Sequence, residues 1–273
     1  MNKFILTLAL VLLTTSTVFA ADKYSADYLK NHKHFAIMNP VAESFAARTI
    51  KSSLQKETGG KYDVKFEGYT LSSMKKGIFK DLEITGENVV SEGITIPYVH
   101  LKSLSDYNYV DYTKDPIEFK SDMKFQYDML LSDESINTAL KHSTYNAVLE
   151  NINKVAYPMF MVKGVKTKIL NNQLYVVTSY NFPIMPASKD KVFVVSSGFI
   201  VENGKIKASN IKLDSAYGNI SLSKVANLLN LLNPLEFTLN ILESKKCDAN
   251  IENVNIVDNK IKIDGKIEVK RGE

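Results

Sequence analysis

VNIVDNKIKI, at Val254–Ile263, is the clearest of three similar stretches that decide the fold; the others are VKTKILNNQLYV at Val165–Val176 and FIVENGKIK at Phe199–Lys207. In each stretch, two runs of alternating apolar and polar residues flank a short turn rich in Asn, Asp or Gly. Two-residue hairpin turns need positive φ, which these residue types reach at low steric cost. Each stretch therefore predicts a β-hairpin with one apolar face.

Two helical regions and further strands are predicted before these hairpins. Asn39 and Pro40 are typical of a helix start, and Gly59-Gly60 ends that amphipathic segment. From residue 61 to about 125 the alternation has a period of two, which predicts an antiparallel meander. Ser132 is a good N-cap for a second helical region, which we interpret as a kinked helix or two short ones.

A third helix and one more strand are predicted between the second and third hairpins. Ser221 caps a segment with apolar residues at helical spacing, and Pro234 is expected to end it. The alternation over residues 236–241 then predicts a strand. Because helices and strands are interspersed without strict βαβ alternation, and hairpins need antiparallel pairing, the predicted fold class is α+β.

The first 20 residues have the anatomy of a secretory signal. A short basic start precedes the apolar run Phe4–Leu13, and Val18-Phe19-Ala20 is a small-x-small cleavage pattern. We therefore expect residues 1–20 to be a signal peptide and the protein to be exported, to the periplasm or the extracellular space. The rest has no Pro-, Gly- or Ser-rich linker, which predicts a lead-in and amphipathic helix over 21–60 and a single domain over 61–273.

Charge and cysteine content exclude several classes of protein. The chain has 34 Lys and Arg against 30 Asp and Glu, a formal net charge of +4, and the charges are evenly interleaved. This excess is too small to predict nucleic-acid binding. Cys247 is the only cysteine, so no intramolecular disulfide can form, and no His or carboxylate pattern accompanies it as a nucleophile would need.

Motifs for catalysis and for cofactor binding are missing from the sequence. There is no Gly-x-Ser-x-Gly elbow and no phosphate-cradling glycine motif. His32 and His34 lack a third zinc ligand nearby, and the run from Asp106 lacks the Gly and the final Glu of an EF-hand loop. We therefore expect a non-enzymatic protein without metal or cofactor.

An apolar excess between residues 225 and 242 is the strongest functional signal. It is larger than one helix stripe and one strand face require, because Leu231 and Leu235 fall off the main stripe. Two interpretations stay open, namely ordinary core and a wall shared with a cavity for a hydrophobic ligand. In the second interpretation the candidate ligand-binding residues are Val225, Leu228, Leu229, Leu232, Phe237, Leu239 and Ile241.

The C-terminal two-thirds resembles the LmeA-like family of secreted bacterial proteins. The resemblance extends over roughly residues 61–270, and its elements are Leu82–Val89, Leu131–Asn137, Phe199–Ile206 and Val254–Gly265. It implies phospholipid binding in the cell envelope. It also implies a fold similar to tubular lipid-binding domains, with a strongly curved antiparallel sheet of hairpins wrapping two or three amphipathic helices. The N-terminal helical segment departs from the family pattern. The resemblance therefore does not tell how the implied cavity is closed.

Two hypotheses of different classes follow. The first is an exported, non-enzymatic binding protein for a phospholipid or another hydrophobic small molecule, with a peripheral membrane contact as a further expectation. Burial of acyl chain would drive binding, at about 0.8 kcal/mol per methylene. The second is a structural or protein-interaction module of the envelope with a filled core, which meets its partner through a hairpin edge or through a patch of Tyr107, Tyr109 and Tyr112. A hydrolase would need His100 or His142 beside a serine and an acid.

Overall fold

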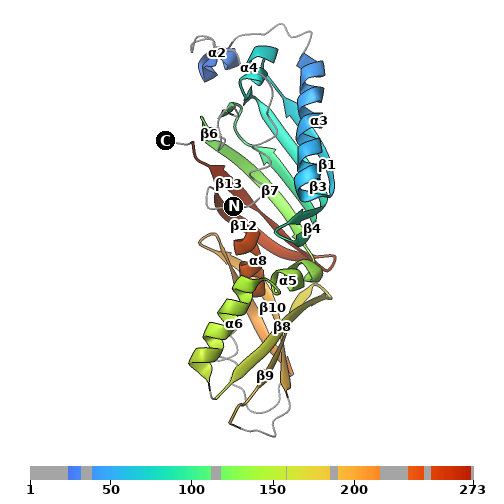
Figure 1. Ribbon diagram of the computed structural model, residues 1–273, viewed down its shortest axis with the longest axis vertical. Coiled ribbons are helices and arrows are strands. Elements are labelled where there is room, and N and C mark those ends of the chain that lie inside the picture. Colours follow the sequence, from blue (N-terminus) through green and yellow to red (C-terminus); the bar gives the residue numbers. More distant parts are fainter. Residues whose placement is uncertain are drawn as a thin grey trace.

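The molecule is elongated, and its two main sheets follow one another along the long axis (Figure 1). This computed structural model describes residues 24–31, 39–111, 118–157, 159–184, 190–215, 233–242 and 247–271. The class is mixed α+β with antiparallel strand pairing, as the sequence predicts. The predicted signal peptide, residues 1–20, lies outside the described residues.

The upper sheet has six strands in the order β1-β3-β4-β7-β13-β12. They are β1 (Lys61–Glu67), β3 (Asp81–Ser91), β4 (Ile94–Ser103), β7 (Met123–Leu131), β12 (Cys247–Val257) and β13 (Lys260–Val269). The first four form the predicted meander, and the C-terminal hairpin extends it because β13 pairs with β7. Beside this sheet lie the short strands β2 (Ile78–Phe79), β5 (Asn108–Asp111) and β6 (Glu118–Phe119).

The upper sheet carries the long helix α3 (Asn39–Thr58), which begins and ends as predicted. Ile50 and Leu54 are buried in the core and Ala46 and Ala47 pack against it, whereas Phe45 is 65 % exposed, so the apolar face packs incompletely. Gly59 and Gly60 both have positive φ, which lets the chain reverse into β1. Two short helices, α2 (Ala26–Asn31) and α4 (Leu71–Lys75), lie at the same end (Figure 1).

The lower sheet has four strands in the order β11-β10-β9-β8. They are β8 (Met161–Leu170), β9 (Gln173–Asn181), β10 (Lys191–Glu202) and β11 (Lys205–Ser215). Three helices accompany it, namely α5 (Asp133–Ala139), α6 (Ser143–Ala156) and α8 (Pro234–Leu242). The predicted second helical region is thus two short helices, and Ser132 caps the first by accepting a hydrogen bond from the Ser135 backbone N–H at 3.1 Å.

All three predicted hairpins are confirmed, as β8–β9, β10–β11 and β12–β13. Their turn residues have positive φ, for example 54° at Asn203 and 72° at Gly204. Two of the turns join the sheets: the Asn172 backbone N–H donates to Asn259 Oδ1, and the Asn259 N–H donates to Asn172 Oδ1, both at 3.2 Å. The third turn approaches β12, since a Cβ on Gly204 would meet Asn250 Oδ1.

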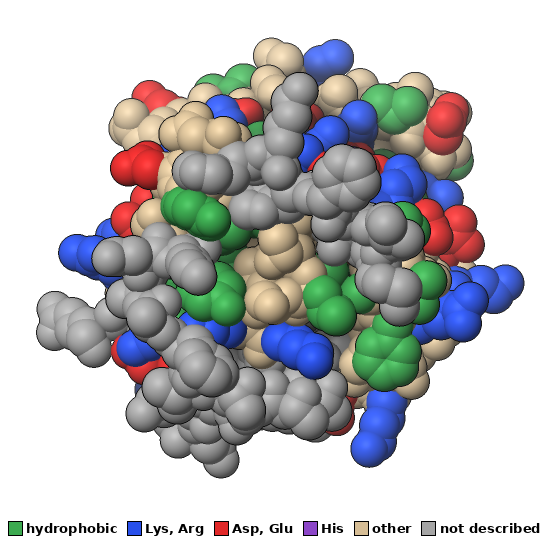
Figure 2. All heavy atoms as spheres, turned by 90° about the horizontal axis from the view of Figure 1, so that it is seen from above, with side chains coloured by type: hydrophobic (Ala, Val, Ile, Leu, Met, Phe, Trp, Pro, Cys, Tyr) green, Lys and Arg blue, Asp and Glu red, His purple; other side chains and the backbone are tan. Residues whose placement is uncertain are grey.

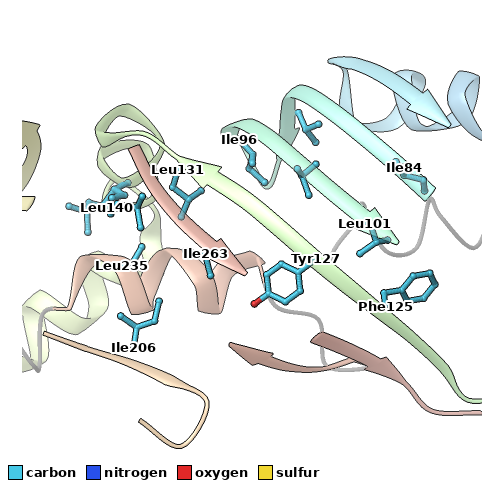
Figure 3. Close-up of a cluster of buried hydrophobic side chains, with 14 of the residues drawn as sticks. Ile84, Ile96, Leu101, Phe125, Tyr127, Leu131, Leu140, Ile206, Leu235 and Ile263 are labelled. Atoms are coloured by element: carbon cyan, nitrogen blue, oxygen red, sulfur yellow. The ribbon is translucent and has the colours of Figure 1, made fainter. Parts of the chain in front are cut away.

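The two sheets share one continuous hydrophobic core. Figure 3 shows its junction, where Leu131 and Ile263 of the upper sheet lie near side chains from the helices and from β11. Leu140 follows α5, Leu235 belongs to α8, and Ile206 of β11 lies close to Leu235 (Figure 3). Helix α5 contacts β4 and β7 of the upper sheet, β8 of the lower sheet and α8, so it links the two sheets at this junction.

The β10–β11 turn provides a test of the hairpin assignment. In the variant Asn203→Val a β-branched residue would occupy positive φ, and we expect a loss of about 1–2 kcal/mol in the free energy of unfolding. Asn203→Gly is the matched control and should change stability by only a few tenths of a kcal/mol. Urea denaturation followed by circular dichroism measures both, and equal stability of the two variants would show that positive φ is not required there.

Candidate ligand-binding site

The segment predicted as a strand over residues 236–241 lies instead in the helix α8, so that prediction is wrong. Pro234, which was expected to end a helix, begins one, because its fixed φ and missing N–H suit the first helical position. Asn233 precedes it, and Asn233 Oδ1 accepts a hydrogen bond from the Glu236 N–H at 3.3 Å. The Phe237 N–H donates to the Asn233 carbonyl at 3.0 Å, which closes the first turn.

Of the candidate ligand-binding residues, Phe237 and Leu239 are described in full. Both are half-buried on α8 and pack against the continuous core. Ile241 lies on the same helix, but its side chain lies outside the described part. The other four candidates lie outside the described residues: Val225, Leu228, Leu229 and Leu232.

Phe237 makes its ring contact with Tyr145 of α6. The ring centroids lie 4.8 Å apart in an edge-to-face arrangement, which is favourable for aromatic pairs. Tyr145 is 1 % exposed, and this burial raises the pKa of its hydroxyl well above the usual value. The Tyr145–Phe237 contact therefore joins α6 to α8 in the interior of the molecule.

A second group of rings lies at the lower end of the four-stranded sheet. The Tyr180 ring centroid lies 5.0 Å from that of Phe160, 5.5 Å from that of Phe182 and 5.6 Å from that of Phe193. We call these four residues the aromatic cluster. Tyr180 and Phe193 are buried, whereas Phe160 and Phe182 are half-buried, so the cluster runs from the core to the surface.

Helix α6 leaves much of its apolar side uncovered. Tyr145 near its start is buried, but Leu149 and Ile152 are only half-buried against the core, and Val155 near its end is 90 % exposed. The helix lies alongside the lower sheet (Figure 1). We call the half-buried residues Leu149 and Ile152 of α6 and Phe160 and Phe182 beside the lower sheet the incompletely buried apolar surface.

Two asparagines fix the helices to the edge strand β8. The amide of Asn153, on α6, accepts from the Val162 N–H at 2.7 Å and donates to the Val162 carbonyl at 2.8 Å. Asn137, on α5, makes the same pair of bonds with Thr167, both at 2.8 Å. Each side chain thus takes the place of a neighbouring strand, which protects the edge from pairing with another chain.

Removal of one of these amides should loosen α6. We expect Asn153→Ala to lower the free energy of unfolding by about 1–3 kcal/mol, because both polar groups of Val162 lose their partner. Hydrogen exchange should become faster at the Val162 amide. The exposed residue Asn151 on the same helix is the matched control, and Asn151→Ala should leave exchange at Val162 unchanged. Unchanged exchange in both variants would contradict this role of Asn153.

A buried hydroxyl lies within the apolar face of the lower sheet. Thr178 of β9 is fully buried, and its Oγ1 has no hydrogen-bond partner among the described residues. Its neighbours across the sheet are Val165 and Phe193. An unpaired buried hydroxyl costs about 1–3 kcal/mol.

Titratable groups gather on the outer face of the upper sheet. His100 Nδ1 lies 3.0 Å from Asp128 Oδ2, and His100 Nε2 lies 3.4 Å from Glu83 Oε1. Lys65, hydrogen-bonded to Glu83 at 3.0 Å, lowers the pKa of that carboxyl, and His100 adds to the effect. This row is a ladder of polar contacts across neighbouring strands, and in the described part these contacts join His100 to two acids, not to a serine.

The other histidine considered for hydrolysis, His142, has a structural contact. It caps the start of α6, where its ring contacts the Thr144 hydroxyl. In the described ranges, no group of three or more His, Cys, Asp and Glu side chains is arranged to hold a metal ion.

The aromatic cluster and the two asparagine contacts were missed by the sequence analysis. Tyr180-Asn181-Phe182 at the end of β9 offered a signal, because alternate aromatic residues at a strand end predict a ring cluster on one face. Asn137 and Asn153 carried no signal, since each contact joins elements that are separate in the sequence.

No protein-family model, curated protein or solved structure matches this chain. The resemblance to the LmeA-like family therefore stays a prediction. Among the helices in the described part, none combines the length and the apolar character that a membrane span requires.

Proposed function

We propose that this chain is an exported, non-enzymatic binding protein for a phospholipid or another hydrophobic ligand of the cell envelope. The observation that carries the proposal is the incompletely buried apolar surface between α6 and the lower sheet. Leu149 and Ile152 of this surface lie on α6, and Phe160 and Phe182 belong to the aromatic cluster at the lower sheet. An acyl chain laid on this surface would gain about 0.8 kcal/mol for each methylene removed from water.

The predicted curved sheet that wraps the helices belongs to the same proposal. In that architecture α5, α6 and α8 lie inside the curve of the lower sheet, and the ligand lies between them and β8–β10. The binding residues we propose are therefore on α6 and β9 as well as on α8.

A filled-core interaction module is the second candidate function. The Tyr145–Phe237 contact and the fully buried Leu235 favour it, because part of the predicted ligand wall is packed core. Its predicted docking surfaces receive less support. Asn137 and Asn153 occupy the edge of β8, and Tyr107 uses its hydroxyl to donate to the Tyr24 carbonyl at 3.1 Å. Tyr112 lies outside the described residues.

Titration with an environment-sensitive fluorescent fatty acid tests the proposal. The chain contains no tryptophan, so the probe can be excited without an intrinsic indole signal. We expect saturable binding that added phospholipid displaces. A filled-core module would give a weak signal that rises linearly with protein concentration and that phospholipid does not displace.

A further inference from the structure

The lower end of the molecule exposes several large apolar side chains. Val155 is 90 %, Tyr157 60 %, Met159 68 % and Ile184 57 % exposed. We call these four residues the tip surface. They come from the end of α6, from the turn that follows it, and from the connection between β9 and β10, all at the lower end in Figure 1.

Strand register places these segments at one end of the sheet. Met161, the first residue of β8, pairs with Asn181, the last residue of β9, so Met159 and Ile184 lie just beyond the same sheet end. The Met159 N–H donates to the Ala156 carbonyl at 3.0 Å, which keeps the turn close to the end of α6. The tip surface is therefore a set of neighbouring segments and not four scattered residues.

The tip surface has a rigid support. The half-buried rings of Phe160 and Phe182 lie next to it in the sequence, and they pack on the buried Tyr180. Asn153 holds the last turn of α6 to the start of β8. The backbone beneath the tip surface is therefore already fixed. Inserting its apolar side chains into another apolar medium costs little further conformational entropy, which favours binding.

Basic residues accompany the tip surface. Lys154, Lys163 and Lys191 are at this end, against the exposed acids Glu150 and Asp190. None of the three lysines forms an ion pair with a described residue, and Lys191 Nζ lies 5.2 Å from the centre of the Phe182 ring. Lysines beside apolar and tyrosine side chains match the interface of an anionic bilayer, where the apolar groups enter the acyl region and the ammonium groups meet lipid phosphates.

Figure 2 views the opposite end, where the described hydrophobic side chains appear together with charged and other polar side chains. We propose that the tip surface is a docking site for an anionic lipid bilayer. This inference goes beyond ligand binding, since Met159 and Ile184 of the tip surface are not among the residues proposed to hold the ligand. Binding of the tip surface to vesicles and binding of the fluorescent fatty acid can therefore be lost independently of each other.

Co-sedimentation with vesicles tests the proposal. We expect the protein to pellet with vesicles of phosphatidylcholine and phosphatidylglycerol, and far less with phosphatidylcholine alone. Met159→Asp and Ile184→Asp should each weaken binding by about tenfold, because a charge replaces an inserted apolar group. Lys191→Gln should weaken binding to the anionic vesicles by about fivefold. Leu104→Asp is the matched control, since Leu104 is 47 % exposed away from the tip, and it should bind as the unchanged protein does.

Three outcomes would overturn the proposal. The first is absence of binding to either vesicle by folded protein. The second is an equal loss in Leu104→Asp and in the tip variants, which would show that binding does not depend on the tip. The third is self-association, seen by size-exclusion chromatography, that the tip substitutions abolish while vesicle binding stays unchanged. This result would make the tip surface an interface between copies of this chain. The fluorescent fatty acid should bind all the tip variants equally well.

Discussion

The variant Tyr145→Ala is expected to lose about 3–5 kcal/mol in the free energy of unfolding, which is the usual cost of truncating a large buried aromatic residue. Tyr145 is the side chain of α6 that is fully buried, and its ring lies 4.8 Å from that of Phe237. Without this ring, α6 keeps mainly its half-buried contacts and the Asn153 amide. Urea denaturation followed by circular dichroism measures the loss.

Tyr145→Phe is the control for this prediction. It keeps the ring and the packing on Phe237 and removes only the hydroxyl, so the expected loss is about 0.5–1.5 kcal/mol. If Tyr145→Ala were no less stable than Tyr145→Phe, the contact between α6 and α8 would contribute little, and α6 would be held by other interactions.

The variant Ile152→Asp is expected to weaken binding of the fluorescent fatty acid by about tenfold or more while the protein stays folded. Ile152 is half-buried on the surface proposed for the ligand, so a carboxylate there keeps contact with water in the free protein and loses it when acyl chain binds. The adjacent residue Asn151 is exposed and provides a matched control with the same new charge. Asn151→Asp should bind the probe as the unchanged protein does.

The two outcomes that would contradict this prediction are distinct. Unfolding of Ile152→Asp, seen as loss of the circular dichroism signal, would show that the surface is filled core. Unchanged probe binding by folded Ile152→Asp would place the ligand elsewhere on the molecule. The first result would favour the interaction module.

Local conformation explains which parts of the fold were predictable. The three hairpins depend on positive φ at short turns, and Asn203 and Gly204 reveal this requirement without any knowledge of the tertiary structure. The two helices after Ser132 were also predictable, because the N-cap serine acts on residues close to it in the chain.

The error at α8 has a local cause as well. Phe237, Leu239 and Ile241 alternate with polar residues, which predicts a strand, but Asn233 and Pro234 form a helix start. The fully buried pair Leu235 and Thr238 has helical i, i+3 spacing. The period of two was therefore coincidental, and Pro234 was interpreted as the end of one helix when it is the start of another.

The candidate site was less predictable because its contacts join distant parts of the chain. Tyr145 meets Phe237 across more than ninety residues of sequence, and Asn137 reaches the backbone of Thr167. Composition alone drew attention to residues 225–242, whereas the half-buried surface on α6 and the aromatic cluster depend on how the helix lies on the sheet. Such packing has no signature in a single sequence.

Organic extraction of the protein, purified without detergent from its exporting host, followed by lipid mass spectrometry tests the central claim most directly. The account predicts a co-purifying amphiphile in near-stoichiometric amount, and less of it in Ile152→Asp than in Asn151→Asp. Lipid-free protein that also fails to bind the fluorescent fatty acid would contradict the claim and leave the filled-core module as the better description.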